Sequence, residues 1–156
     1  MARLLRFAAL AAVLVSLAGC FGGGRQHPIN PPNASIQLLE VQPDGRWKLS
    51  IRLENFSDKT VHYAAFKASL AIAGFAAADI SLNPDIDVPG ENADVVETTL
   101  SPSADALRAF AIESKAPSGA PYELKGTINI PLAGKEFKFE HKSRLSPVPG
   151  IANQYH

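Results

Sequence analysis

The sequence is nearly free of cysteine: Cys20 is the only one among 156 residues. A single thiol cannot form an intramolecular disulfide, so the fold must be stabilised by packing alone. An excess of charge of one sign is also missing, because 15 basic and 15 acidic residues balance. Without residues 1–19, which hold two arginines, 13 basic and 15 acidic residues remain. This balance lacks the clustered basic surface of nucleic-acid-binding proteins, and we expect no nucleic-acid partner.

Motifs of catalysis are absent as well. No serine lies in a Gly-x-Ser-x-Gly elbow, which would expose it as a nucleophile. The glycines at 22–24 follow no predicted strand and open no predicted helix, so they do not form a phosphate-binding loop. We expect a protein that is not an enzyme, with no catalytic residues and no cofactor.

Metal-binding patterns are weak too. His27 and His156 fall in a predicted linker and tail, and His62 and His141 fall on separate strands without a clustered partner. Residues 83–94 carry acidic residues at alternating positions, as a calcium loop does. That loop type needs Gly at its sixth position and a bidentate Glu at its twelfth, where this chain has Val88 and Asp94. We expect no metal site and interpret the segment as a solvated turn.

The N-terminus carries a targeting signal. Arg3 and Arg6 precede an apolar run over residues 7–17, which is shorter than the roughly 17–25 residues of a membrane-spanning helix. The run ends in Leu17-Ala18-Gly19-Cys20, and a basic start, an apolar core and a small-residue exit are typical of a cleaved secretory signal. The ending resembles the lipobox of bacterial lipoproteins. The resemblance implies that residues 1–19 are removed and that Cys20 carries the acyl chains.

These acyl chains would make a membrane the first partner of the protein. Two or more chains anchor a protein stably, whereas one chain gives marginal binding. In the resemblance to Gram-negative lipoproteins, an Asp after the cysteine retains the protein at the inner membrane, and this chain has Phe21 there. The resemblance therefore implies an outer-membrane anchor facing the periplasm. Residues 20–34, rich in Gly and Pro, are predicted to be a flexible linker.

Alternating apolar and polar residues dominate the remainder. Residues 47–55 alternate strictly and predict a half-buried strand. Residues 61–72 change the parity of their apolar positions at Ala64-Ala65, which predicts a bulge. Weaker strands are predicted at 75–82 and 95–100, and one short helix at 101–114, with Ser103 as its cap and Leu107, Phe110 and Ala111 as its apolar face.

The final pair of strands allows a register to be predicted. If residues 131–134 form a four-residue loop, Ile130 faces Lys135, Gly126 faces Phe139 and Lys125 faces Glu140. A shift by one residue would place apolar side chains against charged ones, which a half-buried face does not allow. The strand pattern as a whole predicts a mostly β fold, an immunoglobulin- or fibronectin-III-like antiparallel β-sandwich of about seven strands with one short helix.

Several segments together resemble a known family. They are the 47–55 strand with its Asn-led turn, the 61–74 segment, Val88-Pro89-Gly90, the 122–127 strand and the closing 145–150 segment. In this order they resemble the late embryogenesis abundant (LEA) type 2 family, also called the water-stress and hypersensitive-response (WHy) domain, over residues 35–150. The resemblance implies protection during desiccation or other stress, and no catalytic residues. Residues 151–156 are then a tail.

Three functions remain open at this point. The chain could be a monomeric stress-protection or structural module of the envelope. It could instead bind a lipid or another apolar ligand in a groove of the sandwich, or serve as an accessory subunit that adds its strand edge to a partner's sheet. A large apolar cavity between the sheets would favour ligand binding, and a filled core would favour the first function.

Overall fold

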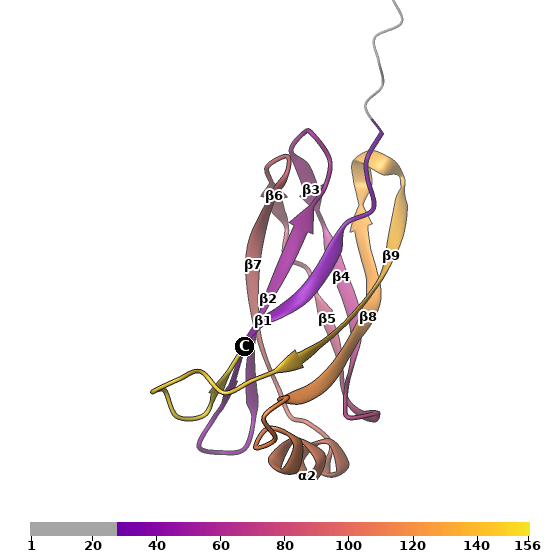
Figure 1. The fold of residues 1–156 in the computed structure, drawn as a ribbon. Coiled ribbons are helices and arrows are strands. Elements are labelled where there is room, and N and C mark those ends of the chain that lie inside the picture. The colour runs from indigo at the N-terminus through magenta and orange to yellow at the C-terminus, as the bar shows by residue number, and fades with distance from the viewer. Residues whose placement is uncertain (1–27) are drawn as a thin grey trace, which may run out of the picture.

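The structure, a computed structural model, describes residues 28–156 and is a β-sandwich of two four-stranded antiparallel sheets (Figure 1). The first sheet has the order β10-β1-β2-β7, and its strands are β1 (Asn33–Val41), β2 (Trp47–Asn55), β7 (Asn92–Leu100) and β10 (Gln154–Tyr155). The second has the order β5-β4-β8-β9, and its strands are β4 (Ala65–Ile72), β5 (Phe75–Leu82), β8 (Ala120–Ile130) and β9 (Lys135–Leu145). A ribbon of β3 (Val61–Tyr63) and β6 (Ile86–Val88) completes the ten strands.

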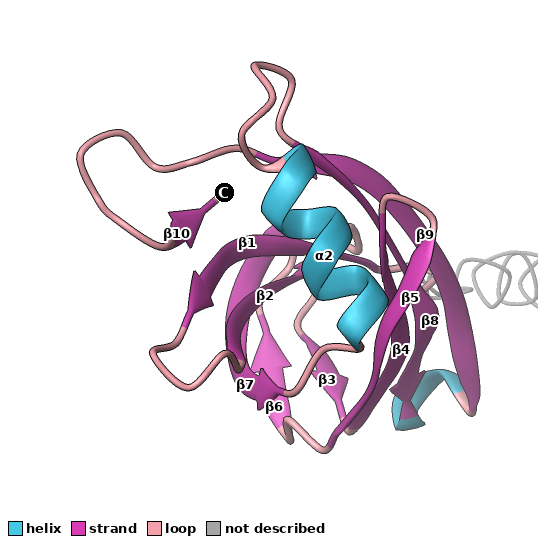
Figure 2. Ribbon diagram, turned by 90° about the horizontal axis from the view of Figure 1, so that it is seen from below, coloured by secondary structure: helices cyan, strands magenta, loops and turns pink. Residues whose placement is uncertain are grey.

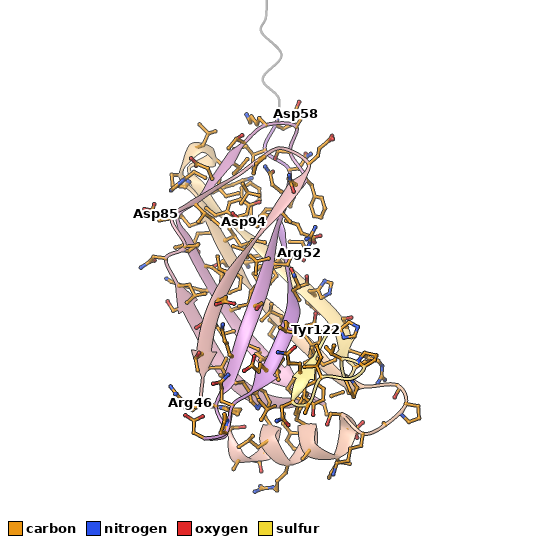
Figure 3. All side chains as sticks on the ribbon, turned by 90° about the vertical axis from the view of Figure 1, so that its left-hand side faces the viewer. Arg46, Arg52, Asp58, Asp85, Asp94 and Tyr122 are labelled. Carbon is orange, nitrogen blue, oxygen red and sulfur yellow. The ribbon has the colours of Figure 1, made fainter. Side chains whose placement is uncertain are left out.

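The sandwich has two distinct ends. At the end that we call the helix end, α2 (Ala104–Glu113) lies across the opening between the sheets (Figure 2). At the opposite end, which we call the proximal end, residue 28 lies beside the β2–β3 loop, the β6–β7 loop and the 3-10 turn η2 (Pro131–Ala133) (Figure 1). Asp58 lies at the proximal end and Arg46 at the helix end (Figure 3). In the described part of the chain, no helix combines the length and apolar character that a membrane crossing needs.

The predicted fold class is confirmed, with ten strands where about seven were expected. One difference lies at Ala64, where the parity of the buried side chains changes as predicted. The change marks a break between β3 and β4 and a passage from the ribbon to the second sheet. Ala64 N still donates to Asn129 O at 3.1 Å, so the backbone of β8 bridges the break. The predicted bulge is therefore wrong: at this position the chain passes from the β3–β6 ribbon to the second sheet.

Other differences lie in segments that were interpreted as linker, loop and tail. β1 begins at Asn33, and Ala34 is fully buried, although both fall within the predicted 20–34 linker. β6 lies within the predicted loop at 83–94 and pairs with β3. β10 lies within the predicted 151–156 tail and pairs with β1. Because β6 has three residues and β10 two, neither is long enough to show a strand periodicity.

The core fills the space between the two sheets. Trp47, Leu49, Ile51 and Leu53 of β2 are 0% exposed, as their alternation predicts. The second sheet supplies its own fully buried side chains to the same cluster, among them Phe66, Ile72, Leu124, Ile128 and Ile130. Burial of this apolar surface is the main source of stability in a domain without disulfides.

The β8–β9 hairpin has the predicted register. Ile130 pairs with Lys135, Gly126 with Phe139 and Lys125 with Glu140. The four-residue loop closes at Gly134, whose φ of 63° is the left-handed conformation that glycine adopts readily. Phe139 stacks on Phe66 of β4, with ring centroids 5.6 Å apart. The apolar face therefore fixes the register, as the sequence indicates.

Helix α2 begins and packs largely as expected. The Ser103 side chain accepts a hydrogen bond from Ala106 N at 3.2 Å, which confirms the predicted cap. Phe110 is 4% exposed and contacts Trp47, with ring centroids 5.1 Å apart. Leu107, which is 37% exposed, and Ala111 lie outside the buried face, contrary to the prediction, because Ala106 and Phe110 form that face.

Candidate functional site

Cys20 is the residue to which the sequence assigns a function, and it lies outside the described residues. Its acylation stays a prediction. The described chain begins at Pro28, at the proximal end of the sandwich (Figure 1). There Asn30 N donates to Ser57 Oγ at 3.0 Å, and Asn30 Nδ2 donates to Phe56 O at 2.6 Å. These bonds fix the chain to the sandwich at Asn30, ten residues after Cys20.

The acidic segment at 83–94 contacts a histidine. Asp87 of β6 pairs with His62 of β3, and Asp87 Oδ1 lies 2.9 Å from His62 Nδ1. Asp85 Oδ1 lies 3.1 Å from His62 Nε2, and the side chain of Asp85 is 83% exposed. Both ring nitrogens can donate at once only when the imidazole is protonated. The hydrogen bond to Asp87 is the main cause that raises the pKa of His62, and the negative charges of Asp87 and Asp85 act in the same direction.

This cluster is an exposed ion pair at the edge of the ribbon. Asp85 has a φ of 51°, and the turn it makes brings its carboxylate to the ring of His62. Across residues 28–156, no group of three or more His, Cys, Asp or Glu side chains is arranged to hold a metal ion. The arrangement can hold a proton on the imidazole between two carboxylates.

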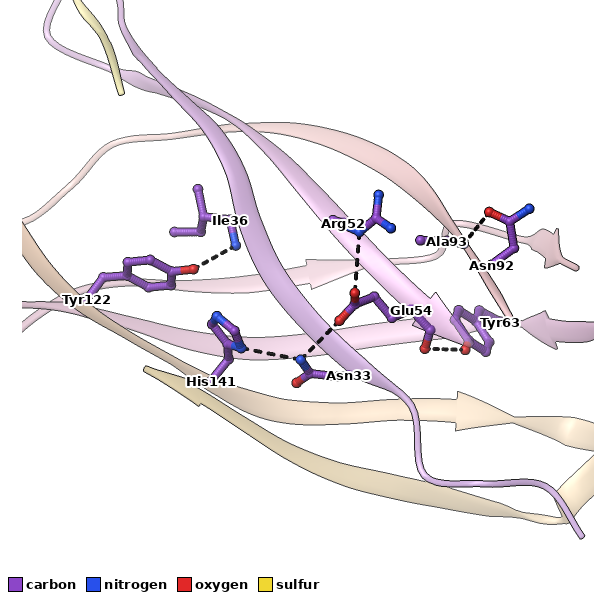
Figure 4. A network of polar contacts seen from close by, with 9 residues as sticks. All are labelled: Asn33, Ile36, Arg52, Glu54, Tyr63, Asn92, Ala93, Tyr122 and His141. Atoms are coloured by element: carbon purple, nitrogen blue, oxygen red, sulfur yellow. Dashed lines mark hydrogen bonds and ion pairs between the residues drawn. The ribbon is translucent and has the colours of Figure 1, made fainter. Parts of the chain in front are cut away.

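A second polar network joins β1 and β2 of the first sheet to β8 and β9 of the second (Figure 4). Asn33 Nδ2 of β1 donates to Glu54 Oε2 at 3.2 Å and lies 3.3 Å from His141 Nδ1 of β9. Tyr122 OH of β8 accepts a hydrogen bond from Ile36 N at 3.2 Å, and burial raises the pKa of Tyr122. His141 thus lies on β9 at the end of the apolar face formed by Phe137 and Phe139, in contact with Asn33.

Asn55, which ends β2 and begins the predicted Asn-led turn, holds several segments of the proximal end together. Its side chain is 2% exposed, and its Nδ2 reaches Lys59 O at 2.8 Å, Val88 O at 3.0 Å and Pro89 O at 3.0 Å. Its Oδ1 accepts from Ser57 N at 2.9 Å. One amide therefore joins the ends of β2 and β6 with the loops at the proximal end. An Asn that ends a buried strand is the signal that could have indicated this role.

Two apolar grooves lie on the surface rather than between the sheets. The first, of about 620 Å³, lies beside the β4–β5 turn and is lined by Ala71, Gly74 and Tyr122 among others. The second, of about 570 Å³, lies between α2 and β10 and is lined by Trp47, Phe110 and Tyr155 among others. Trp47 Nε1 is buried without a hydrogen-bond partner in the described part of the chain. This second groove was not predicted, because it depends on β10 and on the turn after α2.

Comparison with known proteins identifies the architecture. No protein-family model matches the sequence, and no curated protein matches it. The fold is similar to the solution structure of AT1g01470 from Arabidopsis thaliana, with a TM-score of 0.54 and 14% identity over 85% of this chain and 93% of that chain. At this identity the likeness concerns the fold alone.

Two further solved structures are more distant. One is a solution structure of At2g46140.1, a candidate late embryogenesis abundant protein, with a TM-score of 0.46 and 15% identity over 88% of this chain and 82% of that one. The other is a crystal structure of a protein from Archaeoglobus fulgidus, with a TM-score of 0.38 and 14% identity over 78% of this chain and all of that one. The strands and sheets themselves define the class, an antiparallel β-sandwich with one α-helix in its described part.

Proposed function

We propose that this protein is a membrane-anchored, non-catalytic lipoprotein of the LEA type 2 (WHy) kind, with a stress-protection or structural role in the cell envelope. Cys20 is its anchor, and the outer membrane, on the periplasmic side, is its location. The proposal rests on the lipobox-like ending at Cys20 and on the family resemblance of residues 35–150. The sandwich fold, shared with the Arabidopsis thaliana protein, is compatible with it.

The observation that carries the proposal is the filled core. Large side chains of both sheets, from Trp47 to Ile130, are fully buried in one cluster. A core packed in this way leaves its interior little room for a ligand. The protein then acts through its outer surface, by shielding or positioning another component of the envelope.

The polar side chains support the same interpretation. His62 is paired with Asp85 and Asp87, and His141 is bonded within the inter-sheet network. On the outer face of the second sheet, Lys142 lies 2.7 Å from Glu140 and 3.5 Å from Glu123. These groups contact one another at the surface, where such pairs contribute little to stability and serve solubility.

Complementation of a gene deletion tests this function. We expect the deletion to weaken the envelope or reduce drying tolerance, without a metabolic block. We expect four alanine variants to complement the deletion: His62→Ala, Asp85→Ala, Asp87→Ala and His141→Ala. Cys20→Ser should fail to complement it, because this change removes the anchor. If one of the four alanine variants folds normally, as judged by circular dichroism, and still fails to complement, an overlooked reactive site is the better explanation.

The groove between α2 and β10 favours one alternative, a module that binds a lipid or another apolar ligand. Its wall is mostly apolar and includes the aromatic rings of Trp47, Phe110 and Tyr155. Titration with a long-chain fatty acid, followed by Trp47 fluorescence, tests this function. Ala111→Phe fills the groove and should abolish a saturable signal, whereas Ile112→Phe, outside the groove, should leave it unchanged.

A further inference from the structure

The proximal end of the sandwich exposes large apolar side chains. Phe56, in the β2–β3 loop, is 51% exposed, and Leu132, in η2, is 67% exposed. Ile29 packs against the core, and a groove of about 560 Å³ is lined by Ile29, Leu132 and Phe137 among others. Large apolar side chains gathered at one end of a small domain mark a contact surface.

The charges at this end fit a membrane surface. Lys135 lies over the ring of Phe137, with its Nζ 4.5 Å from the ring centroid, so its ammonium group lies close to the apolar patch. Asp58 and Glu91 lie in the loops of this end and Glu136 lies at the start of β9, so the patch carries both signs. Such a surface suits zwitterionic headgroups and is not specific for anionic lipid.

The helix end also exposes apolar side chains, with Phe75 at 50% and Ile112 at 70%. The two ends differ in their distance from Cys20. Eight residues separate Cys20 from Pro28, and at about 3.3–3.6 Å each they span at most ~29 Å. β8 has 11 residues and runs from the helix end to η2, a length of about 33 Å. A domain standing on its helix end would hold Pro28 about 33 Å or more from the membrane, which is farther than these eight residues reach.

We propose that the proximal end, through Phe56 and Leu132, rests in the headgroup region of the same membrane that holds the acyl chains of Cys20. The proposal rests on the proposed anchor. The acyl chains hold the domain close to the bilayer, and Phe56 and Leu132 then add a weak apolar contact that orients it. The helix end and the groove beside α2 consequently face away from the membrane, toward the periplasm.

Matched labelling positions test the orientation. Phe56→Cys and Leu132→Cys at the proximal end have close counterparts in exposure in Phe75→Cys and Ile112→Cys at the helix end. Each variant is prepared as the mature acylated protein, labelled with an environment-sensitive fluorophore on its new thiol, and reconstituted into phosphatidylethanolamine–phosphatidylglycerol vesicles. Because all four side chains are exposed, the substitutions should leave the fold intact, which circular dichroism checks.

The expected result is a several-fold stronger quenching of the labels at 56 and 132 by spin-labelled lipid, with iodide quenching the labels at 75 and 112 instead. Equal quenching at both ends, or stronger lipid quenching at the helix end, would overturn the orientation. A label at 132 that is shielded from iodide but not quenched by lipid would indicate a protein contact and would also overturn it.

A failure of the anchor itself is seen separately. Intact mass of the same preparations shows whether Cys20 carries acyl chains. If it does not, the proposed function fails. Membrane contact by the proximal end is then tested separately, with the label at 132 on the unacylated chain mixed with the same vesicles. Quenching of this label by lipid would support membrane contact by the proximal end even without the anchor. No quenching would refute both the anchor and the membrane contact.

Discussion

Gly126 of β8 lies directly against the carbonyl of Lys67 in β4. A Cβ at Gly126 would lie well inside van der Waals contact of Lys67 O and 2.7 Å from Ala68 Cα. On the other side of β8, Gly126 pairs with Phe139. The backbones of β8 and β4 therefore approach closely at Gly126. The sequence indicates only that Phe139 lies opposite Gly126.

Gly126→Ala should therefore destabilise the domain strongly. The added methyl group meets backbone atoms, which cannot rotate away, so we expect a loss of about 3 kcal/mol or more in the free energy of unfolding. Gly134→Ala is the control: nothing lies within 4 Å of its Cβ position, and only its positive φ opposes the change. It should cost about 1–2 kcal/mol. Urea unfolding of both variants measures the difference, and equal losses would disprove the steric account.

Replacing Asn55 should loosen the proximal end. Asn55→Ala leaves the carbonyls of Val88 and Pro89 without their donor, and we expect a loss of about 2–3 kcal/mol in unfolding free energy. Asn55→Asp should be at least as harmful at neutral pH, because it sets a carboxylate among three carbonyl oxygens. Asn92, which pairs with Asn55 across the ladder but is exposed, supplies the control. Asn92→Ala should change stability by less than about 0.5 kcal/mol.

Phe110→Ala should detach α2 from the sandwich. The ring contacts both Trp47 and Tyr155, with centroid distances of 5.1 and 4.7 Å, and its removal should cost about 3–4 kcal/mol. Trp47 is the only tryptophan, so its emission reports the packing directly and should shift to longer wavelength. Ile112→Ala, on the exposed face of the same helix, should change neither quantity measurably. An unchanged emission in Phe110→Ala would contradict the packing described here.

His62 should titrate above its ordinary pKa of about 6.5, because Asp87 and Asp85 stabilise the imidazolium. The folded-state pKa exceeds the unfolded one, so the stabilising effect is full below the unfolded pKa and is lost as the pH rises through the folded pKa. NMR titration of the imidazole should show Asp87→Asn lowering the pKa of His62 more than Asp85→Asn does. The melting-temperature difference between wild type and His62→Ala should be present at pH 5 and should vanish at high pH. A difference that grows with pH would reverse the assigned sign.

The parts of the fold that could be predicted are those in which the alternation of apolar and polar residues alone determines the structure. The β8–β9 register follows from the alternation of apolar residues and from the loop at 131–134, and no long-range information is needed. The change of face at Ala64 was visible for the same reason. Its cause, a passage to another sheet, depends on β6, which is too short to leave a pattern.

The features that escaped prediction depend on distant partners. Asn55 has the appearance of a turn residue until β6 brings Val88 and Pro89 to its amide. β10 becomes a strand only because the chain returns to β1, where Tyr155 pairs with Leu39. The groove beside α2 and the proximal apolar patch likewise join residues more than 50 positions apart, and a single sequence does not show such contacts.

The central claim, a sandwich held to a membrane through Cys20, is tested most directly by intact-mass spectrometry of the protein extracted from membranes with detergent. The account predicts a chain that begins at Cys20 and carries the added mass of its acyl chains, and a Cys20→Ser variant that remains unprocessed. A chain that retains residues 1–19, or a mature chain whose Cys20 carries no acyl mass, would contradict it.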